Sequence, residues 1–549
     1  MSPDAGVNHA ETAPPYRASM ADLFSDYRFG RAWDEMFAST GGVRPAYDPV
    51  VNAVQSLDAD DLKSRAENLA RAFLDRGVTF DVGGVESPFP LDVIPRIIEA
   101  REWETVAKGV AQRVKALEAF LADVYGPRRC VADGVVPQRV LITSKYFERH
   151  AAGIEPANGV RVHVAGIDLI RDEQGKFRVL EDNVRVPSGV SYVLENRRAT
   201  MQALPELFAG VRARTVSDYP ARLLQALRKA APPGVTDPTV VLMTPGAYNA
   251  AYFEHALLAR TMGVELVEGR DLVCRNNVVS MRTTLGLRRV DVIYRRIDDA
   301  FLDPVHFRPD SALGCPGVLT AARAGNVTIA NAVGNGVADD KLLYTYVPDL
   351  VRYFLNEEPV IDNVDTFRLE EPDHLAEVID RLDELVLKPV DGSGGKGIVI
   401  GPQASHEELA TLRKKVIEDP RGWIAQQVVY LSTVPTVIGE SIAPRHVDLR
   451  PFAVNDGDDV WVLPGGLTRV ALPEGSLVVN SSQGGGSKDT LVLNSPRRSA
   501  WDAKEEVDQM ADFDIALEPP SVRQTHMLSP IPGPGLEQQQ QQQQQGRSC

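Results

Sequence analysis

Apolar residues change their spacing several times along this chain of 549 residues. Between about residues 48 and 125 they recur every three to four positions, for example at Val106, Val110 and Val114, and charged residues fill the positions between. This spacing places the apolar side chains on one side of a helix. The pattern predicts a mainly helical region over 27–150, preceded by a small, polar and disordered N-terminus at 1–26.

The apolar spacing changes to that of strands from Arg161 onward. Val162 to Arg171 and Phe177 to Glu181 are two alternating runs with a turn at Gly175 between them. Two such runs joined by a short glycine-bearing turn predict a β-hairpin. We assign this hairpin to a unit covering 151–235.

A third pattern, over 236–330, alternates short apolar runs with a helical segment. Val240 to Met243 and Val264 to Val267 are the first two runs, Tyr252 to Met262 is the helix between them, and Val290 to Tyr294 is a later run. Strands that alternate with helices pair in parallel. We therefore expect a Rossmann-like domain here.

The last structured unit covers 331–495. Its first part is helical, with Leu375, Ile379, Leu382 and Leu385 on one expected face. Val386 to Tyr430 then follows the order strand, loop, strand, helix, strand, and Ser405 with Glu408 forms a capping box for that helix. Residues 496–549, with eight glutamines from Gln538 to Gln545, are rich in proline and glutamine and are expected to be disordered.

Composition narrows the class of protein. The formal net charge of −16 disfavours a nucleic-acid partner, because phosphate backbones bind basic surfaces. No apolar run is long enough for a membrane-spanning helix, and the N-terminal residues, beginning Met1 to Ala5, have no basic segment followed by an apolar one. Four scattered cysteines indicate reduced thiols rather than a zinc site or a disulfide framework. We expect a soluble cytoplasmic protein with small-molecule substrates and no membrane association; a protein partner is possible but not identifiable.

A glycine-rich loop is the first candidate for chemistry. Gly392 to Gly397 satisfies G-x-G-x-x-G, but the β-branched run Ile398 to Ile400 follows it, whereas a dinucleotide loop opens a helix. A glycine-rich hairpin between two strands can instead cover a triphosphate, with Lys396 at its tip and Lys388 on the entering strand. An ordinary glycine hairpin is the alternative interpretation.

The predicted hairpin at 162–181 supplies candidate metal ligands. Glu181 and Asn183 lie two residues apart and point to one face of a strand, and Asp168 on the neighbouring strand can join them. Mg²⁺ prefers such carboxylate and amide oxygens. The alternative is an acidic hairpin edge paired with Arg178 and Arg185.

These motifs together resemble the ATP-grasp superfamily, in an order that matches a circular permutation. More closely, the chain resembles the circularly permuted type 2 ATP-grasp proteins, which are bacterial, common in mycobacteria and related to the synthetase half of glutathionylspermidine synthetase. The resemblance extends from about Tyr27 to Leu493, and its most specific strings are Gly166-Ile167-Asp168-Leu169, the run Leu180 to Tyr192, and Leu463 to Arg469. It implies an α/β (α+β), circularly permuted ATP-grasp fold with an N-terminal helical region, in which the Rossmann-like pre-ATP-grasp domain at 236–330 lies between a metal-binding segment at 151–235 and a lysine and flap segment at 331–495.

The resemblance also implies roles for individual residues. Asp168, Glu181 and Asn183 would hold magnesium, and Arg185 or Arg450 would stabilise the oxyanion of the acyl phosphate. ATP would be bound by Lys341, Lys388, Gly394, Gly395, Lys396 and either Gln426 or Gln427. One departure concerns Gly166, because the synthetase relative has an arginine two residues before its metal aspartate. This leaves open which arginine contacts the transferred phosphate, and Arg161 and Arg185 are both candidates.

The implied reaction is an ATP-dependent ligation of a carboxylate to an amine through an acyl phosphate, with ATP and Mg²⁺ as cofactors. The alternative is an ATP-binding pseudoligase that acts as a regulatory or assembly subunit. The presence of Asp168, Glu181 and Asn183 favours the enzyme. Arg295 and Arg296 could bind a substrate carboxylate, although paired arginines more often form ion pairs within a protein.

Overall fold

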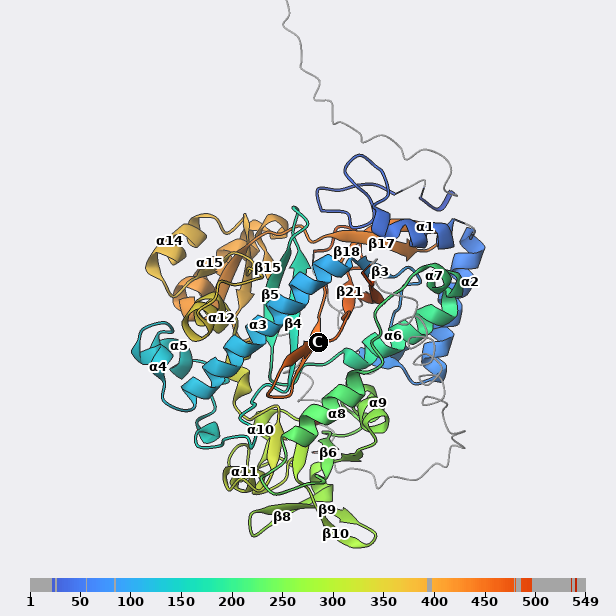
Figure 1. Ribbon diagram of the computed structural model, residues 1–549. Coiled ribbons are helices and arrows are strands. Elements are labelled where there is room, and N and C mark those ends of the chain that lie inside the picture. The colour runs from blue at the N-terminus through green and yellow to red at the C-terminus, as the bar shows by residue number, and fades with distance from the viewer. Residues whose placement is uncertain are drawn as a thin grey trace, which may run out of the picture.

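The computed structural model describes residues 22–24, 27–55, 57–82, 85–392, 397–477, 479, 485–495, 535 and 539–540. Within these ranges, no helix has the length and apolar character required to cross a membrane. Figure 1 shows the long helix α3 lying across a central sheet, with a second sheet below it and a smaller helix-and-sheet unit to one side.

The N-terminal region is mainly helical, as predicted, but its described residues also form the short strands β1, β2 and β3. Its longest helix, α3, presents Val106, Val110, Val114, Leu117 and Leu121 inward, and each is at most 1% exposed. Asp58 and Asp61 cap α2 reciprocally. The elements are α1 (Asp48–Val54), α2 (Ala59–Asp75), β1 (Thr79–Val82), β2 (Val85–Pro88), β3 (Arg96–Ile98), α3 (Ala100–Val124), α4 (Arg129–Ala132) and α5 (Gln138–Ile142).

The predicted hairpin is confirmed as the core of the central sheet. β4 (Val164–Arg171) and β5 (Phe177–Asn183) pair antiparallel, and Gly175 takes a left-handed turn conformation with φ of +78° between them. β19 (Phe452–Asn455) pairs with the other edge of β4, and β20 (Val460–Val462) follows it. The sheet therefore joins segments that are almost 300 residues apart in the chain.

The predicted parallel sheet is also confirmed. Its strand order is β12-β11-β6-β7, with β6 (Val240–Met243), β7 (Glu265–Val267), β11 (Val292–Arg295) and β12 (Thr328–Ala330). Helix α9 (Tyr252–Met262) connects β6 to β7, as expected for a βαβ unit. The other elements between residues 190 and 323 are α6 (Val190–Ala203), α7 (Pro205–Gly210), α8 (Tyr219–Lys229), β8 (Leu272–Arg275), β9 (Val278–Thr283), β10 (Gly286–Arg289), α10 (Asp299–Leu302) and α11 (Val318–Arg323).

The smaller unit has the predicted order of strand, loop, strand, helix and strand. Its sheet has the order β13-β16-β14-β15, and Ser405 and Glu408 form the predicted capping box of α15. The assignment of Leu382 and Leu385 to a helix is wrong: α14 ends at Asp380, Leu382 lies in the turn that follows, and Leu385 begins β14 as a buried residue. The elements are α12 (Lys341–Tyr344), α13 (Val347–Leu350), β13 (Thr366–Arg368), α14 (Pro372–Asp380), β14 (Leu385–Pro389), β15 (Val399–Ile400), α15 (His406–Glu418) and β16 (Trp423–Gln427).

Short strands from the end of the chain complete the body. They are β17 (Thr433–Ile438), β18 (Ser441–His446), β21 (Thr468–Val470), β22 (Gly486–Lys488) and β23 (Thr490–Val492). β23 pairs in parallel with β3, which ties the end of the body to its beginning. Two segments expected to be disordered contain described residues: Asp22–Phe24 forms a short 3₁₀ helix, and Gln539 and Gln540 are helical.

Candidate functional site

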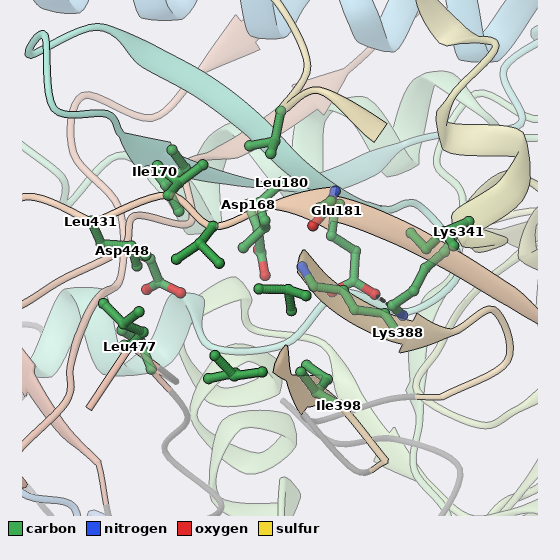
Figure 2. A pocket seen from close by; sticks show the side chains of 18 of the residues that line it. Asp168, Ile170, Leu180, Glu181, Lys341, Lys388, Ile398, Leu431, Asp448 and Leu477 are labelled. Atoms are coloured by element: carbon green, nitrogen blue, oxygen red, sulfur yellow. Dashed lines mark hydrogen bonds and ion pairs between the residues drawn. The ribbon is translucent and has the colours of Figure 1, made fainter. Parts of the chain in front are cut away.

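A cavity lies between the β4–β5 hairpin and the sheet of the smaller unit. It has an apolar part and a charged part. The apolar part includes Ile170, Leu180, Val364, Val386 and Leu431, and the charged or amide side chains that line it are Asp168, Glu181, Lys341, Lys388, Gln426, Gln427, Asp448, Arg450 and Arg469. Figure 2 shows Asp168, Glu181 and Lys388 converging within this space. An apolar slot that ends in charged groups suits a flat heterocycle attached to phosphates.

The hairpin register places two carboxylates side by side. Asp168 on β4 pairs directly with Glu181 on β5, and a β-bulge follows between Asp168 and Leu169. Asp182 points to the opposite face, where both its oxygens accept hydrogen bonds from Arg113 at 2.5 and 2.7 Å. The predicted alternation along this strand is therefore present in the structure.

Asp168 lies at the centre of a buried charge network. Arg450 donates to both of its oxygens, from Nε at 2.5 Å and from a terminal nitrogen at 2.8 Å, and Arg469 adds a bond of 2.8 Å. Arg469 also donates to Asp448. Burial alone would raise the pKa of Asp168, but the two arginines hold it at about 2, so the carboxyl stays ionised.

Gly166 makes room for one of these arginines. A Cβ atom at Gly166 would lie 3.2 Å from Cδ and 3.4 Å from Cγ of Arg450. The aliphatic stem of Arg450 therefore lies across the missing side chain on its way to Asp168. Arg161 lies elsewhere, over the ring of Tyr125, and bonds the carbonyl of Ile154.

Arg185, a predicted catalytic residue, does not line the cavity. It forms ion pairs with Asp298 at 2.8 Å and Asp339 at 3.6 Å, and its guanidinium lies 4.8 Å from the ring centre of Tyr146. Of the predicted arginines, Arg450 is the one that reaches the cavity.

Lys341 enters the cavity from the start of α12. Its Nζ lies 2.7 Å from Oε1 of Glu181 (Figure 2). It also lies 2.5 Å from the carbonyl oxygen of Gly392. Asp340 caps α12 by accepting from the amide nitrogens of Leu342 and Leu343, which fixes where the lysine emerges. Burial lowers the pKa of Lys341, but Glu181 outweighs this and raises it.

Lys388 enters from β14 in a different electrostatic setting. Within the described part of the chain, it forms no hydrogen bond or ion pair. Burial and, to a smaller extent, the neighbouring charge of Lys341 lower its pKa, and Glu181 and Asp168 raise it, with a net pKa of about 8. Its β14 neighbours, paired with Ala425 and Trp423 of β16, fix its position.

The two predicted glutamines end β16 at the cavity. Gln426 is 2% exposed and donates from Nε2 to the hydroxyl of Thr366 at 2.9 Å, and Gln427 pairs with Leu385. Both residues line the cavity, where a heterocycle could accept or donate hydrogen bonds.

The glycine-rich loop is described only at its two ends. The tip residues Gly394, Gly395 and Lys396 lie outside the described residues. At the entering end, the carboxylate of Asp391 pairs with Lys145, and its carbonyl accepts a hydrogen bond from the hydroxyl of Tyr146 at 3.2 Å. β14 and β15 form the predicted antiparallel pair on either side of the loop.

Magnesium was predicted to bind Asp168, Glu181 and Asn183. Among the described residues, no group of three or more His, Cys, Asp or Glu side chains could hold a metal ion, so the amide would have to contribute. The Nδ2 atom of Asn183 is buried without a hydrogen-bond partner, and the amide orientation is open to reversal. The three oxygen-bearing side chains therefore suit Mg²⁺ in kind, although Asn183 does not itself line the cavity.

Arg469 is the main site residue that the sequence prediction missed. The string from Leu463 to Arg469 supported the family resemblance, yet no role was assigned to its last residue. The bridge between Arg450 and Leu467 sets Arg469 beside Asp168, and this register is visible only in the fold. Arg295 and Arg296 instead form internal ion pairs, with Asp299 and Glu254, respectively.

Comparisons with known proteins place this site in a family. An uncharacterized protein of Mycobacterium leprae is 62% identical over 85% of this chain and 83% of its own length. A Synechocystis protein is 50% identical over 85% of this chain and 98% of its own length. A candidate glutamate–cysteine ligase of Frankia alni is 46% identical over 90% of this chain, which corresponds to 57% of the Frankia protein.

A solved structure shares the fold. The apo form of a glutathione synthetase-like effector from Globodera pallida aligns with a TM-score of 0.53 and 12% identity, over 80% of this chain and 98% of the effector. The family model for circularly permuted ATP-grasp type 2 matches residues 95–471. The chain therefore belongs to the circularly permuted ATP-grasp type 2 family.

Proposed function

We propose that this protein is an ATP-dependent ligase that joins a carboxylate to an amine through an acyl phosphate. The observation that carries this proposal is the convergence of Lys341, Lys388, Glu181, Asp168 and Arg450 at the charged end of one apolar cavity. Membership of the ATP-grasp family supports ATP as the substrate, and the name of the Frankia relative supports amide-bond formation.

ATP would enter with its adenine in the apolar slot beside Gln426 and its phosphates toward the lysines. Lys341 from α12 and Lys388 from β14 supply positive charge to the cavity, and the predicted loop residues Gly394, Gly395 and Lys396 would close over the phosphates. Preorganised charges of this kind stabilise phosphoryl transfer without covalent chemistry by the protein.

Asp168, Glu181 and Asn183 are the proposed magnesium ligands. When bound there, Mg²⁺ would neutralise phosphate charge. Because Glu181 is paired with Lys341 and Asp168 with Arg450, these side chains would have to share or exchange partners on binding.

The reaction then has two balanced steps. A carboxylate oxygen of the acid attacks the γ-phosphorus, and the bond from that phosphorus to the bridging oxygen breaks, releasing ADP. The amine nitrogen next attacks the acyl carbon, phosphate leaves with its oxygen, and the nitrogen loses a proton. Arg450 and Arg469, two adjacent guanidinium groups, would stabilise the negative charge on the acyl oxygen and the phosphate.

The pseudoligase alternative rests on one feature of the same site. Asp168 already has three hydrogen bonds from two arginines, so a closed charge network could serve only to hold a bound nucleotide. A ligase releases ADP, whereas a protein that only binds ATP does not, so ADP release distinguishes the two functions.

The test is ADP release by the purified protein with Mg·ATP, with and without a protein-free bacterial metabolite extract. Glu181→Gln provides the blank. We expect extract-stimulated release, reduced on the order of 10²–10³-fold in the variant because one charged ligand is lost. Equal release by the wild type and the variant would contradict the assignment of Glu181. Binding of ATP without stimulated release would favour the pseudoligase.

A further inference from the structure

We propose that the carboxyl edge of the parallel sheet is a docking site for glutamine side chains, occupied here by Gln539 and Gln540 of the same chain. Gln540 is 3% exposed although it belongs to a tract of eight glutamines. Burial of a polar side chain requires compensating partners, and both residues have them on the body of the protein. This inference goes beyond the proposed ligase activity and does not depend on it.

Gly246 forms the floor of the docking site. It follows β6 by three residues and has a φ of +122°. A Cβ atom at this position would lie 2.4 Å from Nε2 and 2.8 Å from Cδ of Gln540, so a larger residue would displace the carboxamide. Nearby, the backbone N–H of Tyr248 donates to Oε1 of Gln540 at 3.3 Å. The site thus depends on close contact between a glycine and a planar amide.

Gln539 makes the second pair of contacts. Its Oε1 accepts from the backbone N–H of Ala312 at 2.8 Å, and its Nε2 donates to the carbonyl oxygen of Asp310 at 2.6 Å. A carboxamide satisfies both backbone groups, whereas a glutamate carboxylate would place two acceptors against a donor and an acceptor. The chemistry of the site therefore selects glutamine over glutamate.

The location supports a binding role. The loop from Thr244 to Gly246 leaves the carboxyl end of β6, and the amide of Thr244 bonds the last residue of β7, Val267, at 2.8 Å. Ligands of open parallel sheets bind beyond the carboxyl ends of the strands. A segment of the same chain reaches this edge at a high effective concentration, so even weak contacts suffice for occupancy.

The test is amide hydrogen exchange of the full-length protein at Tyr248 and Ala312. In Q539A/Q540A, loss of about 1 kcal/mol of hydrogen bonding at each amide should speed local exchange about fivefold. Q539E/Q540E should also speed exchange, because a carboxylate at position 539 would place an acceptor against the carbonyl oxygen of Asp310 and displace the segment. Unchanged exchange in these variants would overturn the proposal. Since both alter only the docked segment, the body should fold normally.

Two further variants examine the glycine floor. Gly246→Ala should expose both amides, whereas Gly263→Ala should leave exchange unchanged, since Gly263 has a φ of +69° but open space around its Cβ position. Equal effects of the two substitutions would attribute the change to backbone strain and contradict the docking site. Exchange that slows as protein concentration rises would show a second copy as the occupant, which would overturn docking within one chain.

Discussion

The two walls of the cavity differ in whether their charged side chains are paired within the protein. On the wall formed by β4 and β5, Asp168 is bound by Arg450 and Arg469, and Glu181 is bound by Lys341 of α12. On the opposite wall, Lys388 stands on β14 without a hydrogen bond or ion pair from the described residues. The first wall is a closed network that holds its shape before any ligand binds. The second carries a cation that the described residues leave available to a ligand.

The largest effect should come from breaking the closed network. Asp168→Asn removes the charge that two buried arginines share and should lower the free energy of unfolding by about 3–5 kcal/mol. Extract-stimulated ADP release should fall on the order of 10²–10³-fold, because Arg450 loses its anchor beside the phosphates. Chemical denaturation and the ADP assay measure the two effects.

Asp182→Asn is the matched control. Asp182 is 1% exposed and binds Arg113 with the same forked geometry, but on the face away from the cavity. We expect a similar loss of stability with ATP binding retained. If both variants lose ATP binding equally, the effect of Asp168→Asn comes from lost stability. The face of the hairpin that carries Asp168 would then have no role in ATP binding that the opposite face lacks.

The two lysines should respond in opposite ways to removal of their charge. Lys388→Met should not lower the free energy of unfolding at pH 7, since the described residues give Lys388 no hydrogen bond or ion pair and a buried charge is removed, yet it should weaken ATP binding about 10–100-fold. Lys341→Met should cost about 1.5–3 kcal/mol of stability, because Glu181 and the Gly392 carbonyl both lose a charged donor. Thermal unfolding and ATP titration separate the effects, and a strongly destabilised Lys388→Met would reveal a hidden partner.

Titration of Lys388 offers a smaller, graded effect. Burial lowers its pKa to about 8, with Lys341 adding to the effect and Glu181 and Asp168 opposing it. The charged form therefore predominates below pH 8 and is lost above it, so ATP affinity should fall by up to about tenfold per pH unit above 8. The unfolded chain binds more protons between pH 8 and 10.5, so this group makes stability rise with pH in that window.

Lys388→Arg is the control for this titration, because guanidinium stays charged over the whole range. Its ATP affinity should vary less between pH 7 and 9.5 than that of the wild type, as measured by titration at each pH. Parallel pH profiles for the two proteins would assign the titration to another group.

The sequence predicted the parts of this site that lie on regular elements. The alternation along 162–183 placed Asp168 and Glu181 on one face and Asp182 on the other, since strand periodicity is a local property. Arg469 could not be found in this way. It lies 301 residues from Asp168, and only the bridge of Leu467 to Arg450 brings it there.

The predicted end of α14 was wrong for a related reason. Leu385 continues the apolar spacing of α14, but the helix stops at Asp380 and the chain turns into β14 to pair with β16. The spacing of apolar residues within 375–385 cannot predict that pairing, because the partner strand lies elsewhere in the chain. The packing of Arg450 over Gly166 could not be predicted from the sequence either, because the need for a glycine at this position follows only from the side chain that packs against it.

The smallest effect should occur where the glycine-rich loop begins. Lys145 and Asp391 form an ion pair whose side chains are 74% and 41% exposed, and the second contact of Asp391 is a backbone one, from Tyr146. Asp391→Asn should therefore change the unfolding free energy by less than about 1 kcal/mol, because water and salt screen exposed pairs. Tyr146→Phe, measured beside it, removes the hydrogen bond to the carbonyl of Asp391 instead of the charge. If ATP affinity shifts in Tyr146→Phe but not in Asp391→Asn, the backbone contact rather than the ion pair positions the loop. The wall that carries Lys388 would then owe its geometry to a neutral hydrogen bond, in contrast to the ion pairs of the opposite wall.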